Sequence, residues 1–375
     1  MPGLLPNVDP DGLLEYSVVY TDRALNHMAQ RFQRVMQDIS GTLKHVYGAR
    51  SAIVVPGSGT FGMEAVARQF AGGKKVLVVR NGWFSYRWSQ IFEMSGVASG
   101  ITVLKARMTA PESKSPFAPA PIDEVVAAIR AGKPDVVFAP HVETSAGMIL
   151  PDDYLQAVAA AVHEHGGLFV LDCVASGAIW VDMAATGVDV IVTAPQKGWS
   201  STPCAGLVML GEHARAVIDS TTSSSFSLDL RKWLAIMEMH EKGAIAYQAT
   251  LPTDGLTQLR DVMQETAAFG FENARAAQQQ IGDRVRALLS SKGIRSVAAP
   301  GFQAPGVVVS YTDHADWQNT KAFAAQGLQI AAGVALACDE PADYKSFRIG
   351  LFGLDKLKNP DRTVATFERA LNALL

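Results

Sequence analysis

The sequence has few cysteines and no long apolar run, and each shortage excludes a class of protein. Its 375 residues contain three cysteines, too few and too scattered for a disulfide framework or a zinc site of Cys-x-x-Cys type. No apolar run reaches the roughly 18 to 20 residues that cross a bilayer. The N-terminal segment lacks the basic region and apolar core of a secretory signal peptide. These absences predict a cytoplasmic protein.

Metal ligands are also scarce in the sequence. His163 and His165 flank a helix end before Gly166-Gly167, where a cation interacts favourably with the helix C-terminus. Neither histidine has a convincing metal-binding spacing, and we therefore expect no metal.

Charged residues are sparse as well, at 18% of the chain against 48% hydrophobic residues. This composition predicts a large buried core and argues against disorder. The formal net charge of -3 gives no long-range attraction to nucleic acid or to an anionic membrane. An anionic ligand must therefore be held by a local arrangement of hydrogen-bond donors.

Short apolar segments alternate with amphipathic helical stretches between about residues 24 and 255. Seven segments rich in Val and Ile are predicted strands: 51–56, 75–79, 101–106, 135–140, 168–172, 188–194 and 206–210. Five helical patterns precede or separate them: 23–47, 62–71, 84–95, 122–131 and 153–165. Continuous apolar strands are typical of a mainly parallel sheet that helices cover on both faces. The sequence therefore predicts an α/β fold.

The last third of the chain has a different, α+β pattern. A long helical stretch is followed by a strand, a helix, a strand and a closing helix, at 255–292, 307–311, 315–326, 346–351 and 361–375. By length, the chain has room for two or three domains of about 150 residues each. We therefore predict an N-terminal arm, a large domain and a small C-terminal domain, at 1–15, 16–255 and 256–375.

Three segments that follow predicted strands suggest chemistry. Ser58, Gly59 and Thr60 form a turn between a strand and a helix, where free N–H groups suit a phosphate. Asp172 ends a strand, where a buried carboxylate needs a partner such as a protonated pyridine nitrogen. Lys197 follows the next strand, and burial would favour the neutral amine of Schiff-base chemistry. Helix caps and an ordinary loop lysine are the alternatives.

The order of these segments, with the lysine 25 residues after the acid, resembles the fold-type I pyridoxal-phosphate enzymes. The local sequences resemble their class V branch, which contains alanine–glyoxylate and serine–glyoxylate aminotransferases. The resemblance implies a mainly parallel seven-stranded sheet with helices on both faces and a smaller C-terminal α+β domain. It also implies pyridoxal 5'-phosphate as the cofactor.

The resemblance implies roles for the residues of the turn and the lysine segment. Ser58, Gly59 and Thr60 match the phosphate-binding turn, and Gln196 precedes the lysine at a position near the phosphate. Lys197 would carry the cofactor as a Schiff base and act as the general base.

Four further positions match residues that contact the cofactor ring. Phe84, in Asn-Gly-Trp-Phe, would stack on the ring, with Trp83 as the alternative. Thr144 would hydrogen-bond the ring edge. Asp172 would pair with the pyridine nitrogen, and Val174 would pack on the ring.

The remaining matches concern the substrate and a second subunit. Arg348, in Phe-Arg-Ile-Gly, matches the arginine that clamps the substrate carboxylate. Tyr247 and Thr250 match a Tyr-x-x-Thr segment that reaches the phosphate of the neighbouring subunit. The resemblance therefore implies a homodimer with shared active sites.

The resemblance implies ping-pong transfer of an amino group from a small amino acid, such as alanine or serine, to a 2-oxo acid such as glyoxylate or pyruvate. An aminophosphonate or aspartate donor stays open, because Arg23 or Arg87 could reach the pocket. Cys338 leaves a cysteine desulfurase or related lyase as an alternative. However, Gln196 and Phe84 occupy positions where desulfurases carry histidine. A non-catalytic binding protein on the same scaffold is the last alternative.

Overall fold

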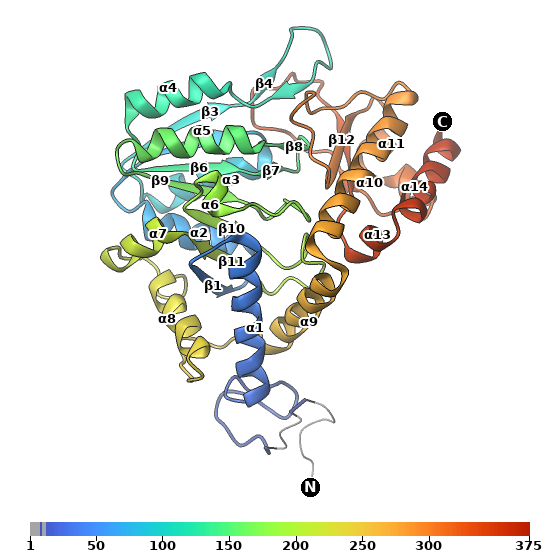
Figure 1. The fold of residues 1–375 in the computed structure, drawn as a ribbon. Coiled ribbons are helices and arrows are strands. Elements are labelled where there is room, and N and C mark those ends of the chain that lie inside the picture. Colours follow the sequence, from blue (N-terminus) through green and yellow to red (C-terminus); the bar gives the residue numbers. More distant parts are fainter. Residues whose placement is uncertain (1–7, 10–12) are drawn as a thin grey trace.

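The computed structural model of the chain describes residues 8–9 and 13–375 (Figure 1). Most of the expected N-terminal arm (1–15) therefore lies outside the described residues. The centre is a seven-stranded sheet in the order β1-β11-β10-β9-β6-β2-β3, with helices packed on both faces. Its strands are β1 Ser51–Pro56, β2 Lys75–Arg80, β3 Gly100–Lys105, β6 Val136–Pro140, β9 Leu168–Asp172, β10 Val190–Thr193 and β11 Ala205–Leu210. All seven predicted strands are present, and the predicted α/β fold is confirmed.

Strand direction brings the three chemical segments to one edge of the sheet. β3, β2, β6, β9 and β10 form parallel pairs, whereas β11 runs antiparallel to both β10 and β1. β1 is therefore parallel to β9 and β10, and their carboxyl ends meet at the same edge. Asp172 ends β9, while Ser58 and Lys197 follow β1 and β10. Ligands of open α/β sheets bind at such an edge.

Among the described residues, eight helices flank the sheet, and the first five of them match the predicted stretches except at the start of the first. They are α1 Gln30–Tyr47, α2 Gly59–Phe70, α3 Trp83–Ser95, α4 Ile122–Gly132, α5 Asp152–His163, α6 Met183–Thr186, α7 Glu212–Val217 and α8 Leu230–Glu241. The predicted start of the first helix at residue 23 was wrong. The side-chain oxygen of Asn26 accepts the Met28 N–H at 2.8 Å. This turn replaces the helical hydrogen bonding of that segment.

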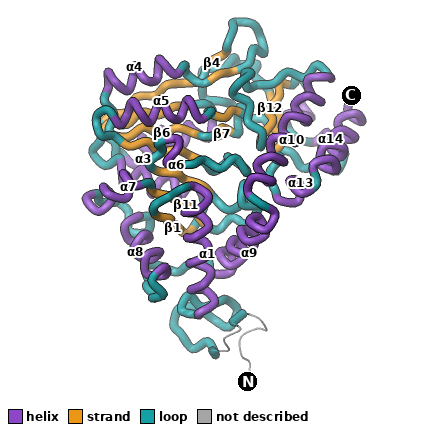
Figure 2. The backbone as a smooth tube through the Cα atoms, in the orientation of Figure 1, coloured by secondary structure: helices purple, strands orange, loops and turns teal. Residues whose placement is uncertain are grey.

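The C-terminal part packs helices against a second, antiparallel sheet (Figure 2). The sheet has the order β12-β14-β13, formed by Val307–Tyr311, Ser346–Gly350 and Ala331–Ala332. Its helices are α9 Thr253–Phe269, α10 Phe271–Ser291, α11 Ala315–Gln318, α12 Lys321–Ala325, α13 Leu354–Lys358 and α14 Pro360–Leu374. The predicted helix at 255–292 is two helices, because Gly270 has a φ of 96°. The predicted helix at 315–326 is likewise divided, at Thr320, which has a φ of 74°.

Short elements complete the described chain: β4 Arg107–Met108, β5 Phe117–Ala118, β7 Val142–Glu143, β8 Met148–Ile149 and a 3-10 turn at Ile218–Ser220. Helix α9 packs on α1, and α10 packs on α13 and α14. Among the helices of the described ranges, none is both long enough and apolar enough to cross a membrane.

Candidate active site

A cavity of about 360 Å³ lies where β1, β9 and β10 end. It is lined by Ser58, Gly59, Thr60, Met63, Phe84, Arg87, Val142, Thr144, Asp172, Val174, Ala175, Gln196, Lys197, Val307, Ala331, Arg348, Gly350 and Phe352. Ten of the twelve residues that the sequence singled out are in this lining; Tyr247 and Thr250 are not. The large sheet contributes one wall, and β12, β13 and β14 contribute the opposite wall.

The turn after β1 presents free hydrogen-bond donors to the cavity. Ser58 precedes α2 with an extended backbone, and its side chain makes no capping hydrogen bond. The first N–H groups of a helix have no partner within the helix and favour an anion. A Cβ at Gly59 would lie 2.8 Å from a methyl group of Val174 and 3.2 Å from Ala194 Cβ. Glycine is therefore required for this turn to approach the segment after β9.

The Asp172 carboxyl group is buried at the end of β9. Its Oδ1 accepts the N–H of Val174 at 2.9 Å. Burial raises the pKa of Asp172 to about 7, although the Val174 hydrogen bond and the charges of Arg87 and Lys197 act in the opposite direction. The carboxylate thus lacks a close cationic partner strong enough to offset its burial. A ligand with a protonated ring nitrogen would supply that partner.

The Lys197 amine lies beside the ring of Phe352, with Nζ 5.6 Å from the ring centroid. Burial lowers the pKa of Lys197, and the positive charge of Arg348 lowers it further, while Asp172 partly opposes both. The site therefore shifts Lys197 toward the neutral amine, which is the nucleophilic and basic form.

Phe84 is held in the cavity wall by the carboxylate of Glu143. This carboxylate accepts the backbone N–H groups of Phe84 at 3.2 Å and Ser85 at 2.8 Å. It thereby caps the first turn of α3, which has no acidic residue of its own. A Cβ at Gly82 would lie 2.0 Å from the Ser145 hydroxyl, so glycine is required there.

Glu143 was not among the predicted site residues. An acid inside a buried segment indicates that it has a polar partner, but the local sequence does not identify the start of α3 as that partner. Phe84 lines the cavity, whereas the neighbouring Trp83 does not and is 38% exposed.

Two arginines approach the ring of Phe84. The Cζ atoms of Arg87 and Arg348 lie 4.8 and 5.5 Å from its centroid. Nη1 of Arg87 donates to the Thr60 hydroxyl at 3.3 Å, so this arginine lies beside the turn after β1. Of the two arginines considered for the pocket, Arg87 lines it. The Arg23 side chain is 70% exposed and lies 3.8 Å from Asp22, outside the lining.

Arg348 is the cation available to a substrate. Its Nε donates to the carbonyl oxygen of Ala332 at 2.7 Å, which fixes the guanidinium against β13. Within the described ranges, no carboxylate lies at ion-pair distance from Arg348. Its terminal nitrogens can therefore bind a carboxylate through two hydrogen bonds.

Other lining residues add polarity and shape. Thr144 is buried in the wall. The side-chain oxygen of Gln196 is buried and has no hydrogen-bond partner in the part of the chain that the structure describes. Phe352 was missed by the sequence analysis, because it follows β14 and nothing in its local sequence indicates a contact with Lys197.

Tyr247 and Thr250 lie outside the cavity, on the connection between α8 and α9. Their hydroxyl groups are 3.2 Å apart. Tyr247 is 55% exposed, and its ring lies 5.4 Å from that of His27. In the single chain this pair is turned to solvent rather than to its own cavity, and a second subunit could contact it.

Cys338 does not have the environment of a reactive thiol. The residue is buried, and its Sγ lies 3.4 Å from the carbonyl oxygen of Arg80. Burial raises the pKa of the Cys338 thiol to about 12. A nucleophilic cysteine needs an accessible thiolate, so this geometry argues against the desulfurase alternative.

Comparison with known proteins agrees with this geometry. The family model described as aminotransferase class-V matches residues 12–351. An alanine–glyoxylate aminotransferase of Callithrix jacchus is 27% identical, over 92% of this chain and 82% of its own. A 2-aminoethylphosphonate–pyruvate transaminase of Paraburkholderia phymatum is 27% identical, over 98% of both chains. The crystal structure of a subgroup IV aspartate aminotransferase from Thermus thermophilus covers 94% of both chains, with a TM-score of 0.77 and 24% identity.

Proposed function

Because the chain belongs to the class-V aminotransferase family, we propose that it transfers the amino group of a small amino acid to glyoxylate or pyruvate. Enzymes of this family depend on pyridoxal 5'-phosphate. When bound, this cofactor supplies an electron sink and a carrier for the amino group. One observation carries the proposal: the amine of Lys197, the buried carboxyl group of Asp172 and the guanidinium of Arg348 share one cavity.

The lining fits the cofactor at both ends. Ser58, Gly59 and Thr60 would hold its phosphate with the free donors of the first turn of α2. The side-chain NH2 of Gln196, which lines the cavity, would donate a hydrogen bond near the phosphate. At the other end, Asp172 would accept a hydrogen bond from the protonated ring nitrogen. That interaction would offset the cost of burying an ionised carboxylate.

Other side chains would fix the ring between them. Phe84 would pack on one face and Val174 on the other, with Thr144 at the ring edge. Glu143 acts indirectly, because its hydrogen bonds to the first turn of α3 position Phe84.

Lys197 would hold the cofactor covalently through its side-chain nitrogen until an amino donor displaces it. The released amine would then take the proton from the donor's α-carbon. Its lowered pKa suits this role, because a general base must be unprotonated at the working pH.

Arg348 would bind the α-carboxylate of donor and acceptor alike. Arg348→Ala is therefore expected to raise KM for both substrates by about 10- to 100-fold, which corresponds to losing a charged hydrogen-bond pair. Steady-state kinetics with alanine and glyoxylate measure this change. Arg87→Ala is the matched control, because Arg87 bonds Thr60 and should affect KM for these substrates less. The reverse order of effects would move the carboxylate site to Arg87.

The functional unit in this proposal is a homodimer, in which Tyr247 and Thr250 reach the cofactor phosphate of the partner. Removing both hydroxyl groups, with Tyr247→Phe and Thr250→Val, should weaken cofactor retention by roughly 10-fold, as expected for two lost hydrogen bonds. Absorbance titration of the apoprotein with pyridoxal phosphate measures retention. Gln248→Ala is the control, because Gln248 lies between the two residues and its side-chain amide donates to the Phe226 carbonyl at 3.4 Å. Equal retention by all three proteins would contradict the shared site.

The division at about residue 255 also remains our proposal. It assigns the cofactor residues to the large domain (16–255) and Arg348 to the small domain (256–375), so the substrate would bind between the two. We propose small-molecule substrates, no nucleic-acid or membrane partner, and a cytoplasmic location.

The function is tested by incubating the purified protein, loaded with pyridoxal phosphate, with single amino donors in the absence of an acceptor. Alanine or serine should yield one equivalent of its oxo acid per site, and glyoxylate or pyruvate should then regenerate the starting form. Aspartate and 2-aminoethylphosphonate belong in the same panel. A preference for either would indicate that Arg87 binds a second anionic group. No carbonyl product from any of the four donors, whether an oxo acid or the aldehyde from 2-aminoethylphosphonate, would contradict the proposal.

A further inference from the structure

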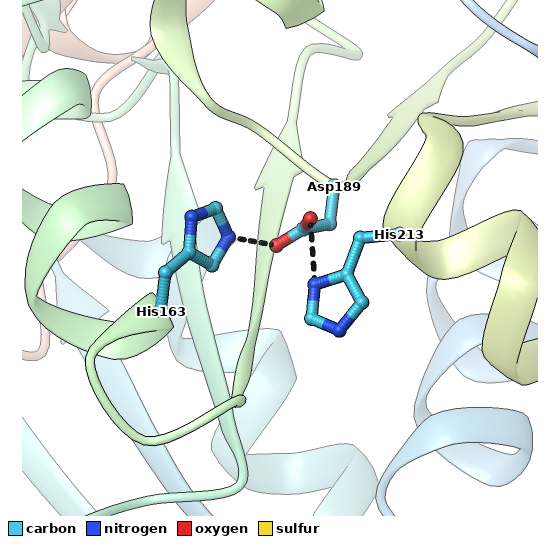
Figure 3. Close-up of side chains that lie close together, drawn as sticks. All are labelled: His163, Asp189 and His213. Atoms are coloured by element: carbon cyan, nitrogen blue, oxygen red, sulfur yellow. Dashed lines mark hydrogen bonds and ion pairs between the residues drawn. The ribbon is translucent and has the colours of Figure 1, made fainter.

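Three potential metal ligands meet at the edge of the large sheet opposite the cavity. His163 is the last residue of α5, Asp189 directly precedes β10, and His213 is in the first turn of α7. Figure 3 shows both imidazole rings turned toward the carboxylate of Asp189. Asp189 precedes β10 whereas Lys197 follows it, so the strand separates this cluster from the candidate active site.

The distances between the three side chains suit one metal ion bound by all of them. His163 Nε2 lies 2.8 Å from Asp189 Oδ2, and His213 Nδ1 lies 3.3 Å from Asp189 Oδ1. All three ligand atoms lie within 4.8 Å of one another. Zinc ligands at about 2.0 to 2.2 Å from the metal are separated by about 3.4 Å in a tetrahedral site. Small rotations of the two rings are therefore sufficient to place all three atoms around one ion.

The burial of the Asp189 carboxylate also favours a positively charged partner. The Asp189 side chain is only 5% exposed, and its Oδ2 accepts the Phe169 N–H at 2.7 Å. No lysine or arginine of the described ranges forms an ion pair with it. Within the part of the chain that the structure describes, its potentially charged partners are the two imidazoles. A buried carboxylate without a lysine or arginine partner is costly, and a cation would offset that cost.

The geometry points to a binding site for one divalent transition-metal ion of the Zn²⁺ type, held by His163, Asp189 and His213. Two imidazole nitrogens and one carboxylate oxygen are ligands that zinc accepts. Because the set has no sulfur ligand and is not made of oxygen ligands alone, it does not match metals that prefer thiolates or metals that prefer oxygen-only sites. The histidine side chains are 36% and 38% exposed, so an ion can enter from solvent and keep water at its remaining positions. An open hollow of about 490 Å³ adjoins the cluster.

The bound ion would join three elements that are far apart in the sequence. It would tie the C-terminus of α5 and the first turn of α7 to the turn before β10. An ion that binds the folded chain more tightly than the unfolded chain stabilises the fold in proportion to the logarithm of its concentration over Kd. The role that we infer is therefore structural, and the chemistry at Lys197 does not depend on it.

Zinc binding to the cofactor-loaded enzyme tests this inference. The wild-type protein, freed of metal with a chelator, should bind one Zn²⁺ per chain in equilibrium dialysis, with metal content measured by mass spectrometry. Added Zn²⁺ should also raise its Tm. His213→Gln should weaken binding by more than about 10-fold, since even residues behind a metal ligand commonly contribute that much. His165→Gln is the matched control, because His165 bonds the Pro134 carbonyl at 2.8 Å and lies outside the cluster.

Two results would overturn the inference. One is a wild-type protein that binds no Zn²⁺ and shows no Tm shift. The other is a His213→Gln variant that binds as tightly as the wild type, which would place the ion elsewhere, including on the cofactor. Because His213 is partly exposed, this variant should remain folded, and its circular dichroism spectrum and metal-free Tm verify that.

Discussion

Lys197→Ala is expected to reduce amino transfer by more than about 10⁴-fold, the upper end of the range for a lost general base. The substitution removes both the covalent attachment of the cofactor and the group that takes the proton from the donor. Neither neighbour can replace it, because Arg348 stays protonated and Asp172 faces the opposite end of the cofactor in our assignment. Turnover with alanine and glyoxylate, measured with saturating pyridoxal phosphate, gives the loss directly.

A matched substitution separates this effect from general damage to the cavity. Lys356→Ala removes a lysine nearby in the fold, whose Nζ donates to the Phe352 carbonyl at 3.0 Å. It should keep most of the activity. Near-normal turnover by Lys197→Ala would contradict the assignment, whereas equal losses in both variants would attribute the effect to the packing around Phe352.

Asp172→Asn is expected to lower turnover by roughly 10² to 10³-fold, the range for losing one preorganised electrostatic group. Asparagine keeps the shape and can still accept the Val174 N–H, but it cannot stabilise a protonated ring nitrogen. Binding of the cofactor through its phosphate should persist. Single-turnover kinetics at saturating cofactor isolate the chemical step, and an unchanged rate would remove Asp172 from the mechanism.

The same substitution should also change how the stability of the apoprotein depends on pH. Burial raises the folded-state pKa of Asp172 to about 7, well above its ordinary value of 3.8. The folded chain therefore holds this proton more tightly than the unfolded chain does. The contribution of this proton to the free energy of unfolding is fully present below about pH 4 and is lost as the pH rises through 7. The Tm of the Asp172→Asn apoprotein minus that of the wild-type apoprotein should therefore increase from pH 4 to pH 8. Thermal melts across that range measure this difference.

The large sheet could be predicted from the sequence because its strands are continuous apolar runs between clear helical patterns. The errors occurred where local geometry overrides periodicity. The turn at Asn26 delays α1, and the positive φ angles of Gly270 and Thr320 divide two predicted helices. None of these breaks changes the apolar periodicity of its segment, so the periodicity of the sequence does not reveal them.

The candidate site was predictable where its residues follow strands, because parallel strands bring their carboxyl ends together. Ser58, Asp172 and Lys197 belong to this class. The contacts of Phe352 with Lys197, and of Glu143 with the start of α3, join segments far apart in the chain and leave no local pattern. The proximity of His163, Asp189 and His213 was not predicted for the same reason, because more than twenty residues separate them at each step.

The most direct test of the central claim is to locate the cofactor on the chain. The purified protein is incubated with pyridoxal phosphate, reduced with borohydride and digested, and the peptides are analysed by mass spectrometry. The account predicts one phosphopyridoxyl group per chain, on Lys197, which disappears when an amino donor is added before reduction. Labelling of another lysine, or of none, would contradict the account.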